Sequence, residues 1–320
     1  MRSRLIIYIT IAFLCASVAS CQKSEMAPRQ GEQHKVRVVA SLFPLYDFVR
    51  NVGGERVAVT LMLPPGVEPH SFEPRPADIM GLNNADVFVY TNQYMEPWVS
   101  GIIKGMDSRH TLILDSSKGI KLIEEKNGGH ERGHQGDVHG HAGMDPHVWL
   151  DLGNAVVMVD NICNGLSAKD PANESYYRNS AEQYKVVLRG LDDKFRKGLG
   201  NCDKKTFVNG GHFAFGYLAA RYGLQYISAF GFSPDAEPTP GQLVKISKIL
   251  KQQGLHYIFY EELLAPNVAE TISRETGAKL ILLHGAHNVG SEEFRKGVSF
   301  VTLMENNLKN LETGLQCRNK

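Results

Sequence analysis

Short apolar runs alternate with longer segments of helical periodicity along most of the chain. Runs rich in valine, isoleucine, leucine and aromatic residues predict strands at 36–40, 56–63, 86–90, 111–115, 205–208, 224–229, 256–260 and 279–283. Helical spacing with start and stop signals predicts helices at 43–49, 76–84, 151–166, 212–223, 239–253, 266–276 and 297–311. Because strands and helices alternate with short links, the pattern predicts an α/β fold with parallel sheets flanked by helices.

The middle of the chain predicts one long helix that opens near Asp170-Pro171. Apolar residues recur there every three or four positions, at Tyr177, Ala181, Tyr184, Leu188, Leu191, Phe195 and Leu199. At about 1.5 Å per residue such a helix is about 40 Å long, which exceeds the width of a small domain. We interpret it as a rigid spine that joins two lobes; a helix lying across one large domain is the alternative.

The length of 320 residues also favours two lobes over one core. The predicted elements divide the chain into a signal peptide (1–20), a flexible tether (21–35), a first α/β lobe (36–168) with a histidine-rich loop at 129–143, a linking helix (169–201) and a second α/β lobe (202–320). A net charge of +1 lacks the basic excess typical of nucleic-acid binding, so we expect no nucleic-acid partner.

The N-terminus has the features of an export signal. Arg2 and Arg4 precede an apolar run at 5–18, which is shorter than the ~20 residues that span a bilayer. The residues before Cys21 read V-A-S and resemble a bacterial lipobox, in which the cysteine is lipidated and becomes the mature N-terminus. We therefore expect an exported protein, anchored by lipid at Cys21 on the periplasmic or cell-surface face; an ordinary cleaved signal peptide is the alternative.

Three cysteines remain beyond the signal and the anchor: Cys163, Cys202 and Cys317. Export permits a disulfide, and three thiols permit at most one. The sequence leaves the pairing open. Since the chain contains no C-x-x-C motif, a thiolate zinc site is not expected.

Histidines are concentrated between residues 129 and 150. His130, His134, His139 and His141 lie in a glycine-containing tract without apolar periodicity, which predicts a loop. His147 instead follows an Asp-Pro turn and precedes the apolar residues V-W-L. We therefore expect His147 to be a rigidly held metal ligand and the four upstream histidines to form an auxiliary, low-specificity metal loop; a solvated loop without ligands is the alternative for those four.

Further histidines follow the ends of predicted strands. His70 comes after the strand at 56–63, His212 after 205–208 and His284 after 279–283, with His287 three residues further on. In open parallel sheets, ligands bind beyond the carboxyl ends of the strands. The first lobe would contribute His70 and His147 and the second lobe the others, which predicts a metal site in the cleft between lobes.

Five motifs follow one another along the chain. They read GVEPHSFEP around His70, DPHVWLD around His147, HFAFGYLAARYGL from His212, DAEPTP from Asp235, and TGAKLILLHGAHN through His284 and His287. In order and spacing they resemble the zinc- and manganese-specific solute-binding proteins of bacterial ABC transporters, and the resemblance runs from about Val36 to the C-terminus. It implies that His70, His147 and His212 are metal ligands. The fourth ligand in that family is usually Asp or Glu; here it is open between His284, His287 and water.

The donor atoms favour Zn²⁺ as the bound ion. Neutral imidazoles suit zinc, copper or nickel, whereas manganese prefers more oxygen ligands. Zinc accepts three or four nitrogens in tetrahedral geometry. Because protons compete for histidine, we expect binding to weaken as the pH falls through about 6 to 6.5.

The resemblance implies a protein that captures Zn²⁺ with high affinity outside the cytoplasmic membrane and delivers it to an ABC permease driven by a cytoplasmic ATPase. We expect a monomer and no enzymatic activity. Three alternatives are a binding protein for manganese or another divalent metal, a surface adhesin or zinc buffer with the same site, and a secreted zinc hydrolase. The hydrolase would need a general base beside the metal, for which Glu68 and Glu73 flank His70.

Overall fold

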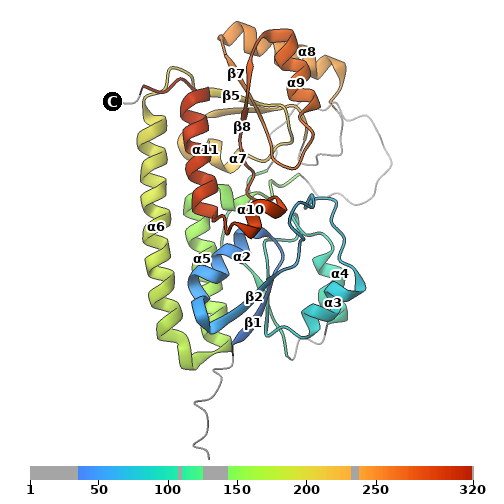
Figure 1. Cartoon of the computed structure of the whole chain (residues 1–320), viewed down its shortest axis with the longest axis vertical. Helices are drawn as coiled ribbons and strands as arrows, with labels where there is room; N and C mark the ends of the chain where they lie inside the picture. The colour runs from blue at the N-terminus through green and yellow to red at the C-terminus, as the bar shows by residue number, and fades with distance from the viewer. Residues whose placement is uncertain (1–34, 107–109, 125–142, 232–237, 319–320) are drawn as a thin grey trace, which may run out of the picture. The chain divides into compact units, whose positions relative to one another are not determined.

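The computed structural model describes residues 35–106, 110–124, 143–231 and 238–318 (Figure 1). The predicted signal peptide and Cys21 lie outside these residues, as does all of the predicted tether except Lys35. His130, His134, His139, His141 and Asp235 also lie outside them.

The first lobe contains a sheet of four parallel strands in the order β2-β1-β3-β4. The strands are β1 (Val36–Ala40), β2 (Val57–Leu61), β3 (Val87–Tyr90) and β4 (Leu112–Asp115). The helices between them are α2 (Phe43–Gly53), α3 (Pro76–Asn83) and α4 (Val99–Gly105). In register, Val38 of the central strand β1 lies between Val59 of β2 and Val87 of β3, and it is buried.

The second lobe repeats this topology with a parallel sheet in the order β6-β5-β7-β8. Its strands are β5 (Thr206–Asn209), β6 (Gln225–Ser228), β7 (Tyr257–Tyr260) and β8 (Lys279–Leu282). Its helices are α7 (Gly216–Tyr222), α8 (Pro240–Gln253), α9 (Asn267–Thr276), α10 (Ser291–Arg295) and α11 (Phe300–Gly314). Two parallel sheets flanked by helices confirm the predicted fold class, and all eight predicted strands are present to within two residues at each end.

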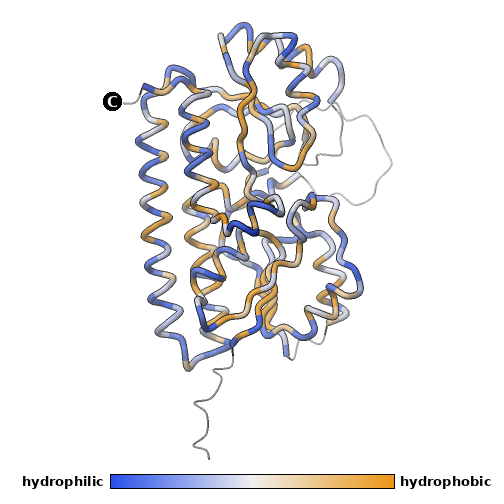
Figure 2. The backbone as a smooth tube through the Cα atoms, viewed as in Figure 1, coloured by the Kyte–Doolittle hydropathy of each residue, from blue (hydrophilic) through white to orange (hydrophobic). Residues whose placement is uncertain are grey.

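Two long helices connect the sheets: α5 (Leu152–Lys169) and α6 (Glu174–Gly200). Asp151 caps α5 as predicted, because its side chain accepts hydrogen bonds from the amides of Gly153 and Asn154. All seven apolar residues of the predicted spine are buried in α6, which has 27 residues and is therefore about 40 Å long. The tube of α6 alternates between hydrophobic and hydrophilic residues in Figure 2, as expected of a helix with one buried face. It packs against α5 and α2 as well as α11 (Figure 1).

The start of α7 differs from the prediction of a helix beginning near His212. The helix begins at Gly216. The reason is local, since the carbonyl of His212 accepts hydrogen bonds from the Tyr226 hydroxyl (2.8 Å) and the Asn209 amide (3.2 Å). That carbonyl is thus occupied by side chains and does not start a helical ladder.

Three further differences concern helices. The short helices α4 and α10 were not predicted, because neither shows a full period of apolar spacing. The last helix begins at Phe300 and not at residue 297, since Ser299 caps it by accepting from the amide of Thr302. Within the described ranges, no helix has the length and hydropathy needed to cross a membrane.

Two polar side chains, Asp47 and Arg221, connect elements of the two halves to one another. Asp47 on α2 accepts hydrogen bonds from the hydroxyl of Tyr184 on α6 and from the amide of Phe300 at the start of α11. Arg221 on α7 donates to Asp151 before α5 and, with two nitrogens, to Asp192 on α6. Each side chain joins three elements, so the connecting helices are bonded to both halves.

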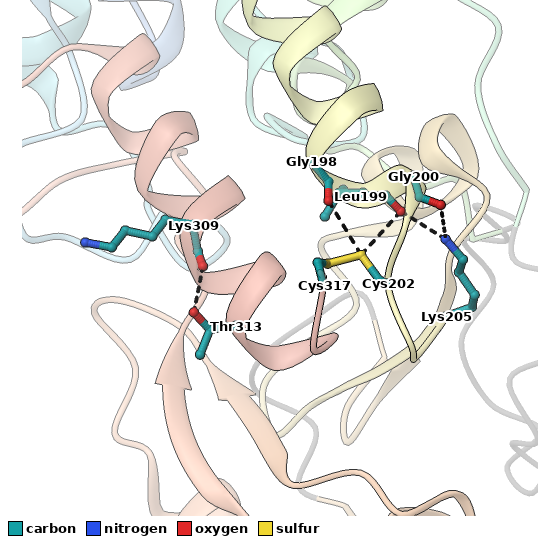
Figure 3. Close-up of a disulfide and its surroundings, with 8 residues drawn as sticks. All are labelled: Gly198, Leu199, Gly200, Cys202, Lys205, Lys309, Thr313 and Cys317. Atoms are coloured by element: carbon teal, nitrogen blue, oxygen red, sulfur yellow. Dashed lines mark hydrogen bonds between the residues drawn. A yellow bond between two sulfur atoms is a disulfide. The ribbon is translucent and has the colours of Figure 1, made fainter. Parts of the chain in front are cut away.

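One disulfide, Cys202–Cys317, settles the pairing that the sequence left open (Figure 3). It joins the residues just after α6 to those just after α11, across a sequence separation of 115. Beside it, the Lys205 ammonium donates to the carbonyls of Leu199 and Gly200 at the end of α6. Cys163 is a free, buried thiol.

Candidate metal centre

Four histidines from distant parts of the sequence meet at the carboxyl ends of the two sheets. The ligand atoms that they offer all lie within 4.8 Å of one another, and the residues are His70, His147, His212 and His287. His70 lies in the loop after β2, His212 follows β5 and His287 follows β8, while His147 directly precedes the 3₁₀ helix Val148–Leu150. Thus each lobe contributes two histidines.

The spacing of the ring nitrogens suits a tetrahedral ion. The Nε2 atom of His147 lies 3.2 Å from Nε2 of His70 and 3.1 Å from Nε2 of His212. Nitrogens that bind zinc at about 2.0–2.1 Å in tetrahedral geometry are separated by about 3.3 Å. The spacing of these nitrogens is therefore close to that of ligands on one zinc ion.

A buried carboxylate backs three of the four rings on the side away from this centre. Asp145 Oδ1 lies 2.9 Å from Nδ1 of His147, and Glu261 Oε2 lies 2.5 Å from Nδ1 of His212. Glu262 Oε1 lies 3.1 Å from Nδ1 of His287. A carboxylate at Nδ1 favours the tautomer with its proton there, which leaves Nε2 free to bind a metal.

Burial and neighbouring charges favour the neutral form of two of the rings. Burial lowers the pKa of His147 well below its usual value, and the charges of His212, His70 and His287 lower that pKa further. Burial likewise lowers the pKa of His70 well below the ordinary range, with smaller contributions from His212 and His287. Both rings are consequently neutral near pH 7, the form that binds metal.

Glu262 and His287 form an ion pair that shifts their pKa values in opposite directions. Burial alone would raise the pKa of Glu262, but the charges of His284 and His287 and the hydrogen bonds lower it to about 2. Burial alone would lower the pKa of His287, but Glu262, with help from Glu261 and Glu68, raises it above the ordinary value. Glu262 is therefore ionised, and it stabilises a positive charge at His287.

His284 is not a member of this group of four histidines, the group found among the described residues. Its Nδ1 accepts a hydrogen bond from the amide of Ala286 (2.9 Å), and it also lies 3.2 Å from Glu262 Oε1. Asn307 of α11 holds its backbone, since the side-chain amide accepts from the His284 amide and donates to the His284 carbonyl. The ring thus contributes hydrogen bonds to the loop that presents His287.

Two glycines leave room for the carboxylates. A Cβ atom at Gly211 would lie within bonding distance of Glu261 Oε1, and one at Gly216 would overlap Asp145 Oδ2. In the structure, Gly211 is needed because the Glu261 side chain passes against its backbone.

Sequence reasoning missed the role of these carboxylates. Asp145 was assigned only to a turn, and Glu261 and Glu262 were not singled out. A signal was present for the last two, since they directly follow β7, in the same position relative to their strand as the histidines that were recognised.

One further histidine pattern in the chain bears on the hydrolase alternative. Residues 130–134 read H-E-R-G-H and match the H-E-x-x-H pattern of zinc hydrolases, in which one helix face presents both histidines. The five residues lie outside the described ranges and contain Gly133, which disfavours a helix.

Comparison with known proteins gives consistent matches over nearly the whole chain. The family model described as "Zinc-uptake complex component A periplasmic" matches residues 38–314. The chain is 36% identical over 299 residues to the high-affinity zinc uptake system protein ZnuA of Bacillus subtilis, covering 93% of each chain.

Two streptococcal proteins extend the comparison. The chain is 33% identical over 310 residues to the zinc-binding lipoprotein AdcA of Streptococcus pneumoniae, and spans 60% of AdcA's length. The Zn(II)-bound ZnuA-like domain of AdcA matches with a TM-score of 0.74 and 31% identity, covering 88% of this chain and 99% of that one. The laminin-binding protein Lmb of Streptococcus agalactiae, described as having adhesin and metal-transporting activity, matches with a TM-score of 0.74 and 29% identity, covering 88% of this chain and 99% of that one.

These matches decide between several of the alternatives. The family consists of periplasmic zinc-uptake components and not of enzymes, so the hydrolase hypothesis is rejected. The predicted export of the chain is supported, and zinc is favoured over manganese as the bound ion. On the match over residues 38–314 and the identity to ZnuA, the chain belongs to the family of periplasmic zinc-uptake component A proteins.

Proposed function

We propose that the protein captures one Zn²⁺ outside the cytoplasmic membrane and delivers it to an ABC permease with a cytoplasmic ATPase. The observation that carries this proposal is the cluster of His70, His147, His212 and His287, whose ligand atoms lie within 4.8 Å of one another. Three of these rings have a buried carboxylate at Nδ1. Such carboxylate–histidine pairs are typical of zinc sites.

For the fourth ligand we propose His287, not His284 or water. His287 belongs to the cluster and His284 does not, although Nε2 of each ring is buried without a hydrogen-bond partner. His284 Nδ1 is already used by the amide of Ala286. Replacing the family's usual carboxylate by an imidazole makes the donor set entirely nitrogen, which favours zinc over manganese.

The test is metal content by mass spectrometry after equilibration with equal trace zinc, manganese, copper and nickel. We expect the wild type to retain one zinc per chain through buffer exchange, and we expect His212→Ala to bind zinc so weakly that it retains none. His287→Ala should weaken zinc binding at least about tenfold, because zinc loses one of four ligands.

Two matched variants complete this experiment. His256→Ala removes an exposed histidine at the edge of β7 and should bind zinc like the wild type. His284→Ala should bind more zinc than His287→Ala does. Preference for manganese, or full zinc loss in His284→Ala with retention in His287→Ala, would contradict the proposed site.

We further propose that His130, His134, His139 and His141 gather zinc for the site. The flanks of this tract support the idea, since Glu124 and Met144 form an antiparallel bridge and the Asp145 amide donates to the carbonyl of Ile123. The residues on either side of the tract therefore lie next to each other, and Met144 is three residues before His147. Deletion of 129–143 should reduce zinc uptake only when zinc is scarce, and unchanged uptake under starvation would argue against a gathering role.

The remaining features of the proposal concern the state of the protein outside the membrane. We propose a monomer, anchored by lipid at Cys21, in which the tether 21–35 precedes lobes at 36–168 and 202–320 and the linking helix 169–201. The name of the relative AdcA, a zinc-binding lipoprotein, supports the anchor. Radiolabelled palmitate should be incorporated into the wild type and not into Cys21→Ala.

Adhesion is a second candidate function, favoured by the similarity to Lmb. It uses the same fold and is compatible with zinc binding. Binding of the purified protein to immobilised laminin, compared with uptake of zinc by cells, separates the two functions.

A further inference from the structure

The loop that carries His70 is held in place by a segment of the other lobe. The amide of Gly66 donates to the carbonyl of Val289 (2.8 Å), and the hydroxyl of Ser291 donates to the carbonyl of Pro65 (3.2 Å). The side chain of Asn288 donates to the same loop on both sides of these two contacts, at Pro64 and Val67. The position of His70 is thus tied to residues 288–291, which directly follow His287.

Asn288 makes the strongest of these connections. Its amide nitrogen donates to the carbonyls of Pro64 (2.8 Å) and Val67 (2.7 Å), and its side chain is fully buried. The Pro64 carbonyl also accepts from the amide of Val67 within the loop (3.1 Å). One buried amide therefore satisfies two acceptors of the His70 loop at once.

The segment before Asn288 is itself bonded to the first lobe. The indole of Trp149 donates to the carbonyl of Gly285 (2.8 Å), and the amide of Phe43 donates to the carbonyl of His287 (3.2 Å). His287 belongs to the second lobe, yet its backbone is hydrogen-bonded to α2 of the first lobe. Asn288 then connects this fixed backbone to the loop of His70.

We propose that Asn288 is a positioning residue of the metal site, which fixes the His70 loop against His287 so that these two imidazoles form a ligand pair before zinc arrives. This inference rests on the proposed zinc-binding function. Asn288 touches no ligand atom, so it acts through the placement of His70.

Two substitutions test the proposal. Asn288→Ala removes both donated hydrogen bonds, and we expect the Kd for zinc to rise about 10–100-fold, as is usual when a residue that orients a metal ligand is lost. Asn288→Asp should raise it further, because a carboxylate would face two carbonyl oxygens. Affinity is measured by competition with a chelator, on protein whose circular dichroism matches the wild type.

Asn161 offers a matched control. It lies on α5 and donates its amide protons to the carbonyls of Ser116 and Lys118, two residues just after β4 that are not adjacent in sequence to any proposed ligand. Asn161→Ala and Asn161→Asp remove the same kind of contact and should leave the Kd for zinc within about twofold of the wild type. An equal rise of Kd in the Asn161 and Asn288 variants would overturn the proposal.

A double-mutant cycle separates positioning from general loss of stability. If Asn288 acts through His70, then Asn288→Ala should add little to the Kd of His70→Ala but should add its full effect to His212→Ala. Additive effects in both backgrounds would show that Asn288 does not act through His70.

Hydrogen exchange in the metal-free protein tests whether Asn288 holds the His70 loop in place before zinc binds. The Gly66 amide should exchange slowly in the wild type and in Asn161→Ala, and much faster in Asn288→Ala. Fast exchange at Gly66 in the wild type would refute the preformed pair. Absence of zinc binding together with slow exchange at Gly66 would instead refute the proposed function, while the role of Asn288 in holding the His70 loop would still stand.

Discussion

The imidazole of His287 and the carboxylate of Glu262 show how single residues set the chemistry of the site. Burial on its own would favour neutral forms of both groups. The ion pair outweighs burial, which places the pKa of His287 above its usual value and that of Glu262 at about 2. Burial instead lowers the pKa of His70 and of His147, although Asp145 Oδ1 lies 2.9 Å from Nδ1 of His147. His287 therefore loses its proton at a higher pH than His70 and His147 do.

This difference predicts a stepped pH dependence of zinc affinity. As the pH falls, His287 takes up a proton first, so zinc must displace one proton and the Kd should rise about tenfold per pH unit below that raised pKa. His70 and His147 stay neutral until well below pH 6.5, and the slope should steepen where they take up protons. The loss thus begins above the range of about 6 to 6.5 expected from free histidine.

Chelator competition across the neutral and mildly acidic range measures these slopes. In His287→Gln the first step should disappear, because the proton that zinc displaces is gone. A Kd that stays constant over the whole range would exclude a site made of histidines.

At the scale of an element, the turn from β5 into α7 depends on the shape of its backbone. Gly211 passes against Glu261, whose oxygen would collide with any Cβ. The same turn places His212 with its ring inside and its carbonyl bonded to Tyr226. The irregular residues 212–215 are thus part of the site and not a frayed start of α7.

Gly211→Ala should therefore damage binding as well as folding. Displacing the Glu261 side chain removes the carboxylate behind His212, for which we expect at least a tenfold rise in the Kd for zinc, and overpacking should lower the free energy of unfolding by about 1–3 kcal/mol. Gly190 of α6 is the control, since it is exposed with open space around it. Gly190→Ala should raise the free energy of unfolding by about 0.5–1 kcal/mol and leave zinc binding unchanged. Wild-type zinc affinity in Gly211→Ala would refute this account of the turn.

At the scale of the whole molecule, residues near the end of the chain are tied to its middle. The disulfide Cys202–Cys317 closes a loop of 115 residues that contains the second sheet. Asp47 joins α2 to α6 and α11, and Arg221 joins α7 to α5 and α6. These connections hold the lobes on a common helical frame.

Replacing both Cys202 and Cys317 by alanine should lower the free energy of unfolding by about 2–5 kcal/mol, since the unfolded chain gains freedom. The zinc affinity of the folded protein should not change, because no ligand or carboxylate of the site contacts the disulfide. Denaturant titration measures the loss. A reductant should shift the wild type to the midpoint of the variant and leave the variant unaffected; equal midpoints without reductant would contradict the prediction.

The sequence by itself determined the features that depend on short-range periodicity and residue chemistry. The apolar period of α6, the valine- and leucine-rich strands and the cap at Asp151 are local, so each could be predicted before the fold was known. His70, His147 and His212 could be selected because strand ends in parallel sheets converge, and the motifs around them were recognisable.

Only the tertiary structure decided which groups meet. The pairing of Cys202 with Cys317, the presence of His287 in the cluster and the exclusion of His284 depend on distances between segments up to about two hundred residues apart. Asp145, Glu261 and Glu262 have no distinguishing pattern as letters, because a carboxylate orients a histidine only after folding brings it to Nδ1. Local periodicity thus fixed the elements, whereas long-range packing fixed the metal centre.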